Sequence, residues 1–126
     1  MRIHLIITSL ILLPLATLCG CSNTKTKQNA GILTTKNFEQ LSLQGPMAQG
    51  APGDYFIRND YLTAIIERPG RVFGPGPYGG NIIDLGRNDL REDNLGETIP
   101  FFQFGLTAEF ESVRVVSDGS DGSAAV

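Results

Sequence analysis

The sequence has 126 residues, enough for one small domain, with 10 Lys and Arg against 13 Asp and Glu and a formal net charge of −3. This mildly acidic balance without a basic cluster argues against a nucleic-acid partner, because such binding depends on neutralising phosphates. It also leaves no polybasic patch for anionic lipids, so any attachment to a membrane must come from acyl chains alone.

Residues 1–20 have the organisation of a secretory signal peptide. Arg2 precedes an apolar run over Ile3–Leu18. The run has about 16 residues, fewer than the ~20 that a helix needs to span a bilayer, and Pro14 would interrupt its hydrogen bonds. We therefore expect a helical signal peptide that is cleaved, not a permanent membrane anchor.

The tetrad Leu18-Cys19-Gly20-Cys21 resembles a bacterial lipobox, in which an aliphatic residue and two small residues precede the modified cysteine. The resemblance implies a diacylglyceryl group on the Cys21 thiol, cleavage before Cys21, and acylation of the new amine with a chain such as palmitate. Two or more chains give stable anchoring. Because Ser22 is not Asp, the same resemblance favours the outer membrane, facing the periplasm or the surface. The alternative is a short apolar helix with two incidental cysteines.

Cleavage at this point would remove His4 and Cys19, and lipidation would consume Cys21, so the mature chain would hold no His and no free Cys. Such a chain has no disulfide, no His- or Cys-ligated zinc site, and no Ser-His-Asp or Cys-His nucleophile. We therefore expect no catalytic residue, no metal, no cofactor beyond the acyl groups, and no enzymatic activity in this chain.

The segment after the lipid site, residues 21–36, is polar and predicts a flexible tether. Residues 37–126 predict a β-rich domain. At its start, Leu41 and Leu43 alternate with polar residues, which predicts a short strand.

The strongest hairpin signal lies in the middle of the chain. Tyr55–Arg58 and Tyr61–Glu67 are rich in aromatic and β-branched residues and are separated by Asn59-Asp60, which tolerate turn conformations. Asn81–Leu85 predicts a third strand, and Arg87–Glu97 predicts a charged surface loop. Together these signals favour a mainly β fold, a partial antiparallel β-sandwich.

Two further apolar segments, Ile99–Phe104 and Leu106–Ser117, predict strands, the second with a bulge at Glu111-Ser112. Asp118–Gly122 has the composition of a turn, which leaves only residues 123–126 as its return arm. An arm so much shorter than its partner would expose a long edge and suggests a chain truncated at its C-terminus; the alternative is a short terminal edge strand.

The segment Gly70–Gly80 is dense in Gly and Pro and predicts a rigid surface loop. Its aromatic residues, Phe73 and Tyr78, are candidates for an exposed binding surface, with core filling as the alternative. Gly74–Gly79 matches the letters of a dinucleotide-binding motif, but it leads into a strand where that motif requires a helix. We therefore interpret it as a loop.

The chain from residue 84 to residue 97 is rich in carboxylates that have two interpretations, a calcium site and a solvated charged loop. The residues are Asp84, Asp89, Glu92, Asp93 and Glu97. Their spacing does not match the twelve-residue calcium loop, and Arg87 and Arg91 lie among them. The solvated loop is the interpretation we favour.

Residues 53–60, 64–67 and 78–85 resemble the N-terminal β-rich region of large bacterial envelope lipoproteins, some of which continue into a metal-dependent hydrolase domain. The resemblance covers residues 45–126. It implies a β-sandwich like those that precede or bind carbohydrate-active modules. No metal ligand of such a hydrolase has a counterpart in the mature chain, because that chain lacks His.

These observations predict a lipid-anchored cell-envelope protein that acts as a non-catalytic binding or scaffold module, held by its acyl chains and facing a protein or glycan partner. One alternative is the N-terminal part of a larger lipid-anchored enzyme whose catalytic domain lies downstream. The other is a carbohydrate-binding module that uses Tyr78 and the Gly/Pro loop.

Overall fold

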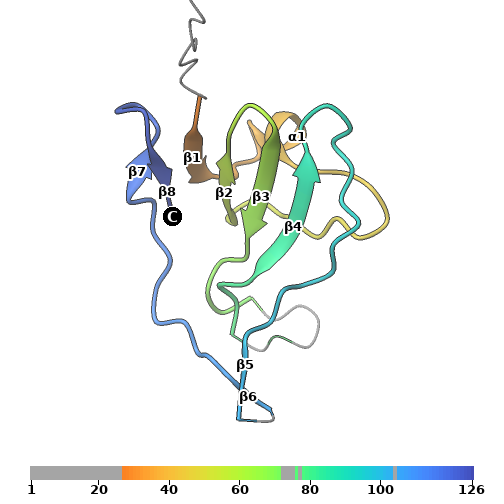
Figure 1. Ribbon diagram of the computed structural model, residues 1–126, viewed down its shortest axis with the longest axis vertical. Helices are drawn as coiled ribbons and strands as arrows, with labels where there is room; N and C mark the ends of the chain where they lie inside the picture. Colours follow the sequence, from red (N-terminus) through yellow and green to blue (C-terminus); the bar gives the residue numbers. More distant parts are fainter. Residues whose placement is uncertain (1–26, 72–75, 77, 104) are drawn as a thin grey trace, which may run out of the picture.

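The computed structural model describes residues 27–71, 76, 78–103 and 105–126. The lipobox, Cys21 and Phe73 lie outside the described residues. Four strands form an antiparallel sheet in chain order: β1 (Asn29–Ile32), β2 (Tyr55–Arg58), β3 (Leu62–Ile66) and β4 (Ile82–Arg87) (Figure 1). Two ribbons accompany it, β5 (Phe101–Phe102) with β6 (Leu106–Thr107) and β7 (Ser117–Asp118) with β8 (Ala124–Ala125). The mainly β, antiparallel prediction is confirmed.

The predicted hairpin is the β2–β3 pair. Phe56 lies opposite Ile65, and the side-chain oxygen of Asn59 accepts hydrogen bonds from the backbone N–H groups of Tyr61 and Leu62, both at 2.8 Å. An asparagine side chain that caps the turn in this way imitates a backbone turn and sets the register of both strands.

The predicted third strand is present as β4, which pairs with β3 and runs on to Arg87. The register between β3 and β4 shifts beside Ile65, where Ile83 is inserted as the extra residue. Because of this bulge, Ile83 and Asp84 are both fully buried, although neighbouring residues of a regular strand point to opposite faces.

The core is small and lies on the inner face of the sheet. Leu33, Phe56, Ile65 and Ile83 are buried there, and Phe38 and Leu41 pack against them. The last two come from α1 (Phe38–Leu41), a single helical turn that lies behind the sheet in Figure 1.

The strand predicted around Leu41 and Leu43 is therefore wrong. Residues three apart share one face of a helical turn, so this conformation directs both Phe38 and Leu41 at the core. Leu43, beyond the end of α1, is also buried.

The predicted tether is wrong over its second half, because β1 begins at Asn29 and pairs with β2 along its whole length. Ala30 is buried and Leu33 is fully buried. The polar residues that suggested a linker belong in part to an edge strand, where one side of the strand faces solvent.

The long strands predicted near the C-terminus are also wrong. Residues 108–116 form no strand, so the predicted bulge at Glu111-Ser112 has no ladder to interrupt. Each arm of the β7–β8 hairpin has two residues, and the unequal arms expected from the sequence are not observed. Alternation of apolar and polar residues predicts a strand only where a partner strand is available to pair with it.

The β7–β8 ribbon lies against β1. The Asn29 side chain donates to the Asp118 carbonyl at 3.0 Å, and the Ala124 N–H donates to the Gln28 side chain at 3.1 Å. At Gly119, which has a positive φ of 97°, a Cβ would collide with the Gln28 carbonyl. This close approach explains glycine at that turn.

Ile65→Ala should lower the free energy of unfolding by about 2–5 kcal/mol, because it leaves a cavity at the centre of the core. Urea unfolding of the purified chain measures the change. Leu62→Ala is the control, since Leu62 lies on the same strand and is 44% exposed. Equal losses in the two variants would contradict this core assignment.

Candidate functional site

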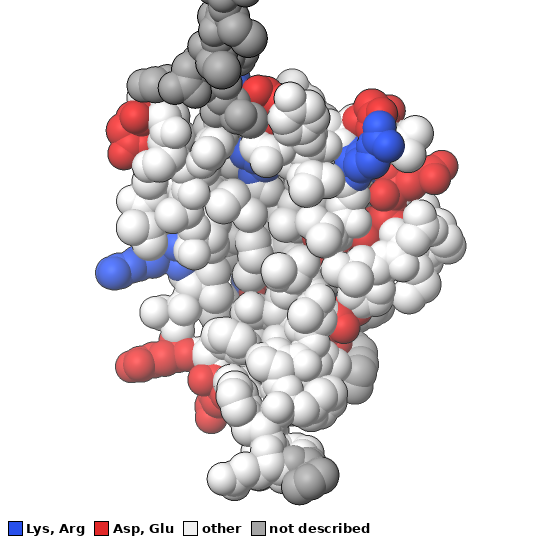
Figure 2. Space-filling view, in the orientation of Figure 1, with Lys and Arg blue, Asp and Glu red and all other residues white. Residues whose placement is uncertain are grey.

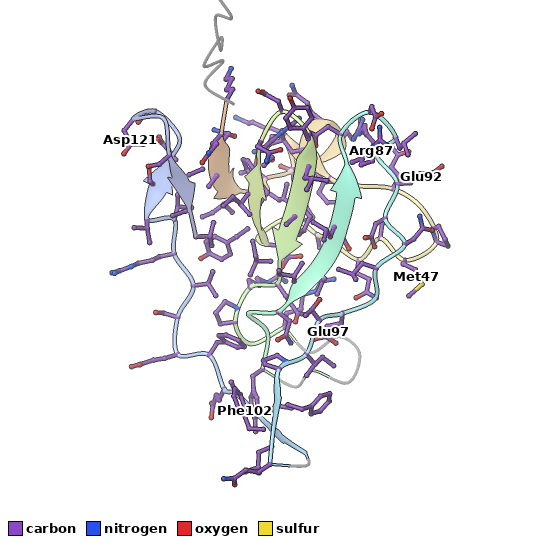
Figure 3. The ribbon with its side chains drawn as sticks, viewed as in Figure 1. Met47, Arg87, Glu92, Glu97, Phe102 and Asp121 are labelled. Atoms are coloured by element: carbon purple, nitrogen blue, oxygen red, sulfur yellow. The ribbon has the colours of Figure 1, made fainter. Side chains whose placement is uncertain are left out.

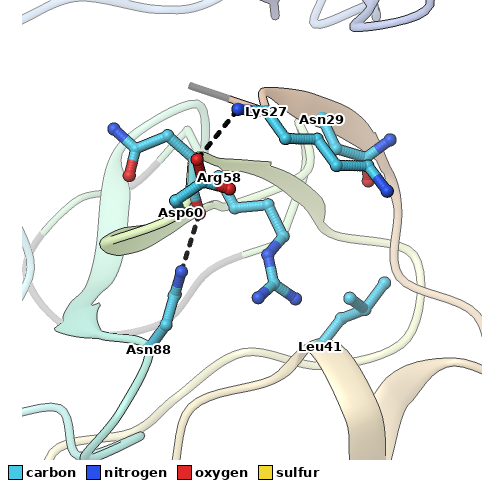
Figure 4. A pocket seen from close by; sticks show the side chains of 7 residues that line it. Lys27, Asn29, Leu41, Arg58, Asp60 and Asn88 are labelled. Atoms are coloured by element: carbon cyan, nitrogen blue, oxygen red, sulfur yellow. Dashed lines mark hydrogen bonds between the residues drawn. The ribbon is translucent and has the colours of Figure 1, made fainter. Parts of the chain in front are cut away.

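A polar cleft lies at the end of the sheet where β1 begins, between β1, the β2–β3 turn and α1 (Figure 4). Its volume is about 450 Å³. Its described lining combines two cations, three amides, one carboxylate and one apolar side chain: Lys27, Asn29, Leu41, Arg58, Asn59, Asp60 and Asn88. The cleft is thus built from four separate segments of the chain.

One wall of the cleft is the β2–β3 turn. The Asn59 side chain is used to cap that turn, and the Asp60 carboxylate accepts the backbone N–H of Lys27 at 3.0 Å. This contact ties the chain just before β1 to the turn.

A second wall is Asn88, which follows β4. Its side-chain oxygen accepts from the Thr63 hydroxyl at 2.6 Å, and its amide donates to the Asn59 carbonyl at 2.7 Å. Its backbone N–H donates to the Tyr61 carbonyl at 2.8 Å. Asn88 therefore has a structural role, and its polar groups are occupied.

Arg58 ends β2 opposite Asn29 and Thr63 and extends its guanidinium into the space between Asn88 and Leu41 (Figure 4). Within the described part of the chain, this half-buried guanidinium makes no hydrogen bond or ion pair. A smaller cavity beside the cleft is lined by both Arg58 and Arg91.

Arg91 is itself held in place. Its guanidinium donates to the carbonyl of Ser42, which follows α1, at 2.9 Å and to the carbonyl of Glu39 within α1. Its backbone has a positive φ of 55°, a conformation that non-glycine residues rarely adopt. Arg91 therefore adds a fixed positive charge next to Arg58.

A second polar cluster lies in the interior, where four carboxylates are fully buried: Asp54, Glu67, Asp84 and Asp93. The prediction of a solvated acidic loop is therefore wrong for Asp84 and Asp93. It is right for Asp89 and Glu92, which are exposed.

Three of these carboxylates hold loops through backbone N–H groups. Asp84 accepts from Gln49 and Gly50 at 2.7 and 2.9 Å, and burial raises its pKa while these bonds oppose the rise. Asp93 accepts from Leu85 at 2.8 Å. Charge-assisted bonds of this kind fasten a loop strongly where few apolar contacts are available.

Asp54 joins the loop before β2 to the segment after β3. It accepts from the backbone N–H groups of Ala51 and Arg68 at 2.8 and 3.1 Å, and it forms an ion pair with the guanidinium of Arg71. Arg71 also donates to the Gln49 carbonyl at 2.7 Å. This network closes the base of the Gly/Pro loop.

Glu67 differs from the other three. Its two side-chain oxygens have no hydrogen-bond partner among the described residues, and its ion pair with Arg71 is long, at 3.9 Å. Burial, followed by the nearby Glu97 charge, raises its pKa to about 7. Glu97 accepts from the Asn81 side chain at 2.7 Å and from the Gly76 N–H at 3.1 Å.

Two further surfaces carry apolar side chains. The β5–β6 ribbon holds Phe101 and Phe102, which are more than half exposed. Figure 3 shows Phe102 on this ribbon. Of the predicted binding loop, Tyr78 is 39% exposed, and its carbonyl accepts the Gly70 N–H at 3.1 Å.

The outer face of the sheet, opposite α1, is also apolar. We define the outer face by the side chains of Ile57, Leu62, Ala64, Ile66, Ile82 and Leu85, none of which is buried. Figure 2 shows few charged side chains over the centre of this view. The β7–β8 ribbon contacts β1 and β2, so it reaches only the β1 side of the sheet.

Searches for similar proteins assign nothing to these surfaces: no family model, no curated protein and no solved structure matches the chain. Among the described residues, no group of three or more His, Cys, Asp or Glu is placed to hold a metal ion. In that same part of the chain, no helix is both long and apolar enough to cross a membrane.

Sequence reasoning missed the cleft because its cations, Lys27 and Arg58, and Arg91 of the adjoining cavity are widely separated in the chain and none belongs to a basic run. The signal available was Arg58 at the end of the predicted strand Tyr55–Arg58. It gained meaning only when the strand pairing was known.

The raised pKa of Glu67 predicts that stability falls as pH rises from about 4.5 to about 7. In this window the folded state binds the proton that the unfolded state has lost, so each step upward in pH favours unfolding. The total change should be up to about 3 kcal/mol. Urea unfolding at several pH values measures it.

Glu67→Gln should remove this slope, because the amide does not titrate. Glu109→Gln changes an exposed carboxylate and should leave the slope in place. An unchanged slope in Glu67→Gln would show that another group is responsible.

Proposed function

We propose that this chain is a lipid-anchored protein of the bacterial cell envelope, attached to the outer membrane through Cys21, and that its folded part is a non-catalytic binding module. The lipobox-like tetrad Leu18–Cys21 behind an apolar run supports the anchor. The open apolar outer face of the sheet is the observation that supports a binding role.

The domain would be held close to the membrane. Since β1 begins at Asn29, the covalent chain allows at most about 22 Å between Cys21 and Lys27. Lys27 lines the cleft, so the end of the sheet with the β2–β3 turn would be the end nearer to the lipid.

The outer face supports a protein partner more than a glycan. Leu62, Ile82 and Leu85 are each more than a third exposed. A depression of about 310 Å³ on this face is lined by four apolar residues, Ile57, Leu62, Ala64 and Leu85, and at its polar end by Gln28, Arg58 and Asn59. Contiguous apolar surface on a soluble domain marks a site where another polypeptide packs.

The exposed apolar outer face also supports the first alternative, in which the chain is the N-terminal part of a larger lipid-anchored enzyme. In that case the outer face would be covered by a later part of the same polypeptide. The second alternative, a carbohydrate-binding module, draws on the partial exposure of Tyr78.

Cys21→Ala should abolish labelling by a fatty-acid analogue, because the Cys21 thiol is the expected lipid site. Metabolic labelling measures the effect. Ser22→Ala is a control that leaves the thiol in place. Retention of the label in Cys21→Ala would overturn the anchor.

A photo-crosslinking side chain in place of Leu62 or Leu85 should give a discrete adduct in intact cells, because both residues lie on the outer face. The same group in place of Glu109, an exposed residue away from that face, should not. An adduct with added mass supports a separate protein partner, whereas a crosslink within one polypeptide supports the larger enzyme. Equal labelling at all positions would contradict a binding role for the outer face.

A further inference from the structure

We propose that the cleft between β1, α1 and the β2–β3 turn binds a phosphate group, with Arg58 as its principal ligand. The starting observation is the Arg58 guanidinium, which is half-buried in a cleft and makes no hydrogen bond or ion pair with the residues that the structure describes. A guanidinium carries five donors in a planar fork, and phosphate oxygens match that fork with two parallel hydrogen bonds.

The surrounding charge favours an anion. Lys27 lines the same cleft, and Arg91 lies across the adjoining small cavity, where the Glu39 and Ser42 carbonyls hold its guanidinium. Asp60 is the one acidic side chain in the lining of the cleft, and its carboxylate is engaged by the Lys27 N–H. Three cations therefore face one carboxylate around this space.

The remaining lining suits a phosphate that carries an organic group. The cleft volume of about 450 Å³ exceeds the needs of an inorganic anion, and Leu41 offers an apolar contact. Asn29 and Asn59 add polar side chains at the rim. The expected ligand is thus a phosphate ester, which could be the headgroup of a membrane lipid or a free phosphorylated solute.

If the phosphate belongs to a lipid headgroup, the inference rests on the proposed function, because an acyl anchor at Cys21 would keep the cleft within about 22 Å of the headgroups. Binding of a free phosphate does not depend on that anchor. The two sources can therefore be separated by the probe.

The test uses the Cys21→Ala chain, which is expected to carry no acyl group. It is titrated with glycerol phosphate, and separately with vesicles of phosphatidylglycerol and phosphatidylcholine or of phosphatidylcholine alone. We expect binding to at least one phosphate-monoester or phosphatidylglycerol probe, weakened by added salt. Binding of glycerol phosphate alone identifies a free solute as the source, and binding of only the phosphatidylglycerol vesicles identifies a lipid headgroup.

Arg58→Gln should weaken this binding about ten- to hundred-fold, because it removes a charge-assisted pair of hydrogen bonds. Arg58→Lys keeps the charge but loses the planar fork and should give an intermediate loss. Arg87→Gln is the matched control, since Arg87 ends β4, which is separated from β2 by β3, and it lies outside the cleft in an ion pair with Asp89 at 2.6 Å. Far-ultraviolet circular dichroism checks the fold of each variant.

Equal losses in Arg58→Gln and Arg87→Gln, or no binding of any probe by the unsubstituted cleft, would overturn the proposal. Should Arg58→Gln fail to fold, protection of the chain against urea by the probe that binds it replaces this variant, with protection expected and its absence counting against the site. None of these readouts depends on lipidation, so a failed phosphate site and a failed anchor remain distinguishable.

Discussion

The pairing of β2 with β3 decides which side chains share a surface in this protein. The Asn59 side chain caps the turn, and the register that follows places Phe56 opposite Ile65 on the inner face and Ile57 opposite Ala64 on the outer face. A slip of one residue would exchange the two sets, exposing the core pair. The same register brings Arg58 to the cleft at one end of the sheet.

Carboxylates supplement a core that contains few apolar side chains. Burying a charge is unfavourable unless it is paired or hydrogen-bonded. Asp54, Asp84 and Asp93 meet that condition by accepting backbone N–H groups of the loops around the sheet. The Glu67 carboxylate has no hydrogen-bond partner among the described residues, and burial, followed by the Glu97 charge, raises its pKa to about 7. Loop positions in this fold thus depend on buried polar contacts as well as on apolar packing.

The proposals divide the molecule into surfaces with different chemistry. The cleft holds Lys27 and Arg58, whose side chains have no partner among the described residues, at the end of the sheet where β1 begins, whereas the outer face is apolar and extends over β3 and β4. An anchored domain with this arrangement would contact lipid or a small anion at one end and polypeptide on its side. The two sites adjoin, because Arg58 and Asn59 line both the cleft and the depression on the outer face, but most of their lining residues differ.

Sequence patterns predicted the secondary structure correctly where the interacting residues are close together in the chain. The β2–β3 hairpin, β4 and the turn between β7 and β8 were predicted because turn residues and alternating apolar residues encode them in short windows. The strand predicted over residues 106–117 is wrong beyond Thr107, because alternation of apolar and polar residues does not provide a partner strand. The prediction of a flexible tether is wrong over β1, because an edge strand that pairs on one side has a composition similar to that of a linker.

The sequence by itself determined the mainly β class, the central hairpin and the motif on which the proposed anchor rests. Only the tertiary structure decided which charges meet and which acids are buried. Arg58 and Arg91 come together through strand pairing and the position of α1, and Asp84 is buried because it pairs with Ile65 on the inner face of the sheet. These outcomes depend on contacts between distant segments, which composition and periodicity do not encode.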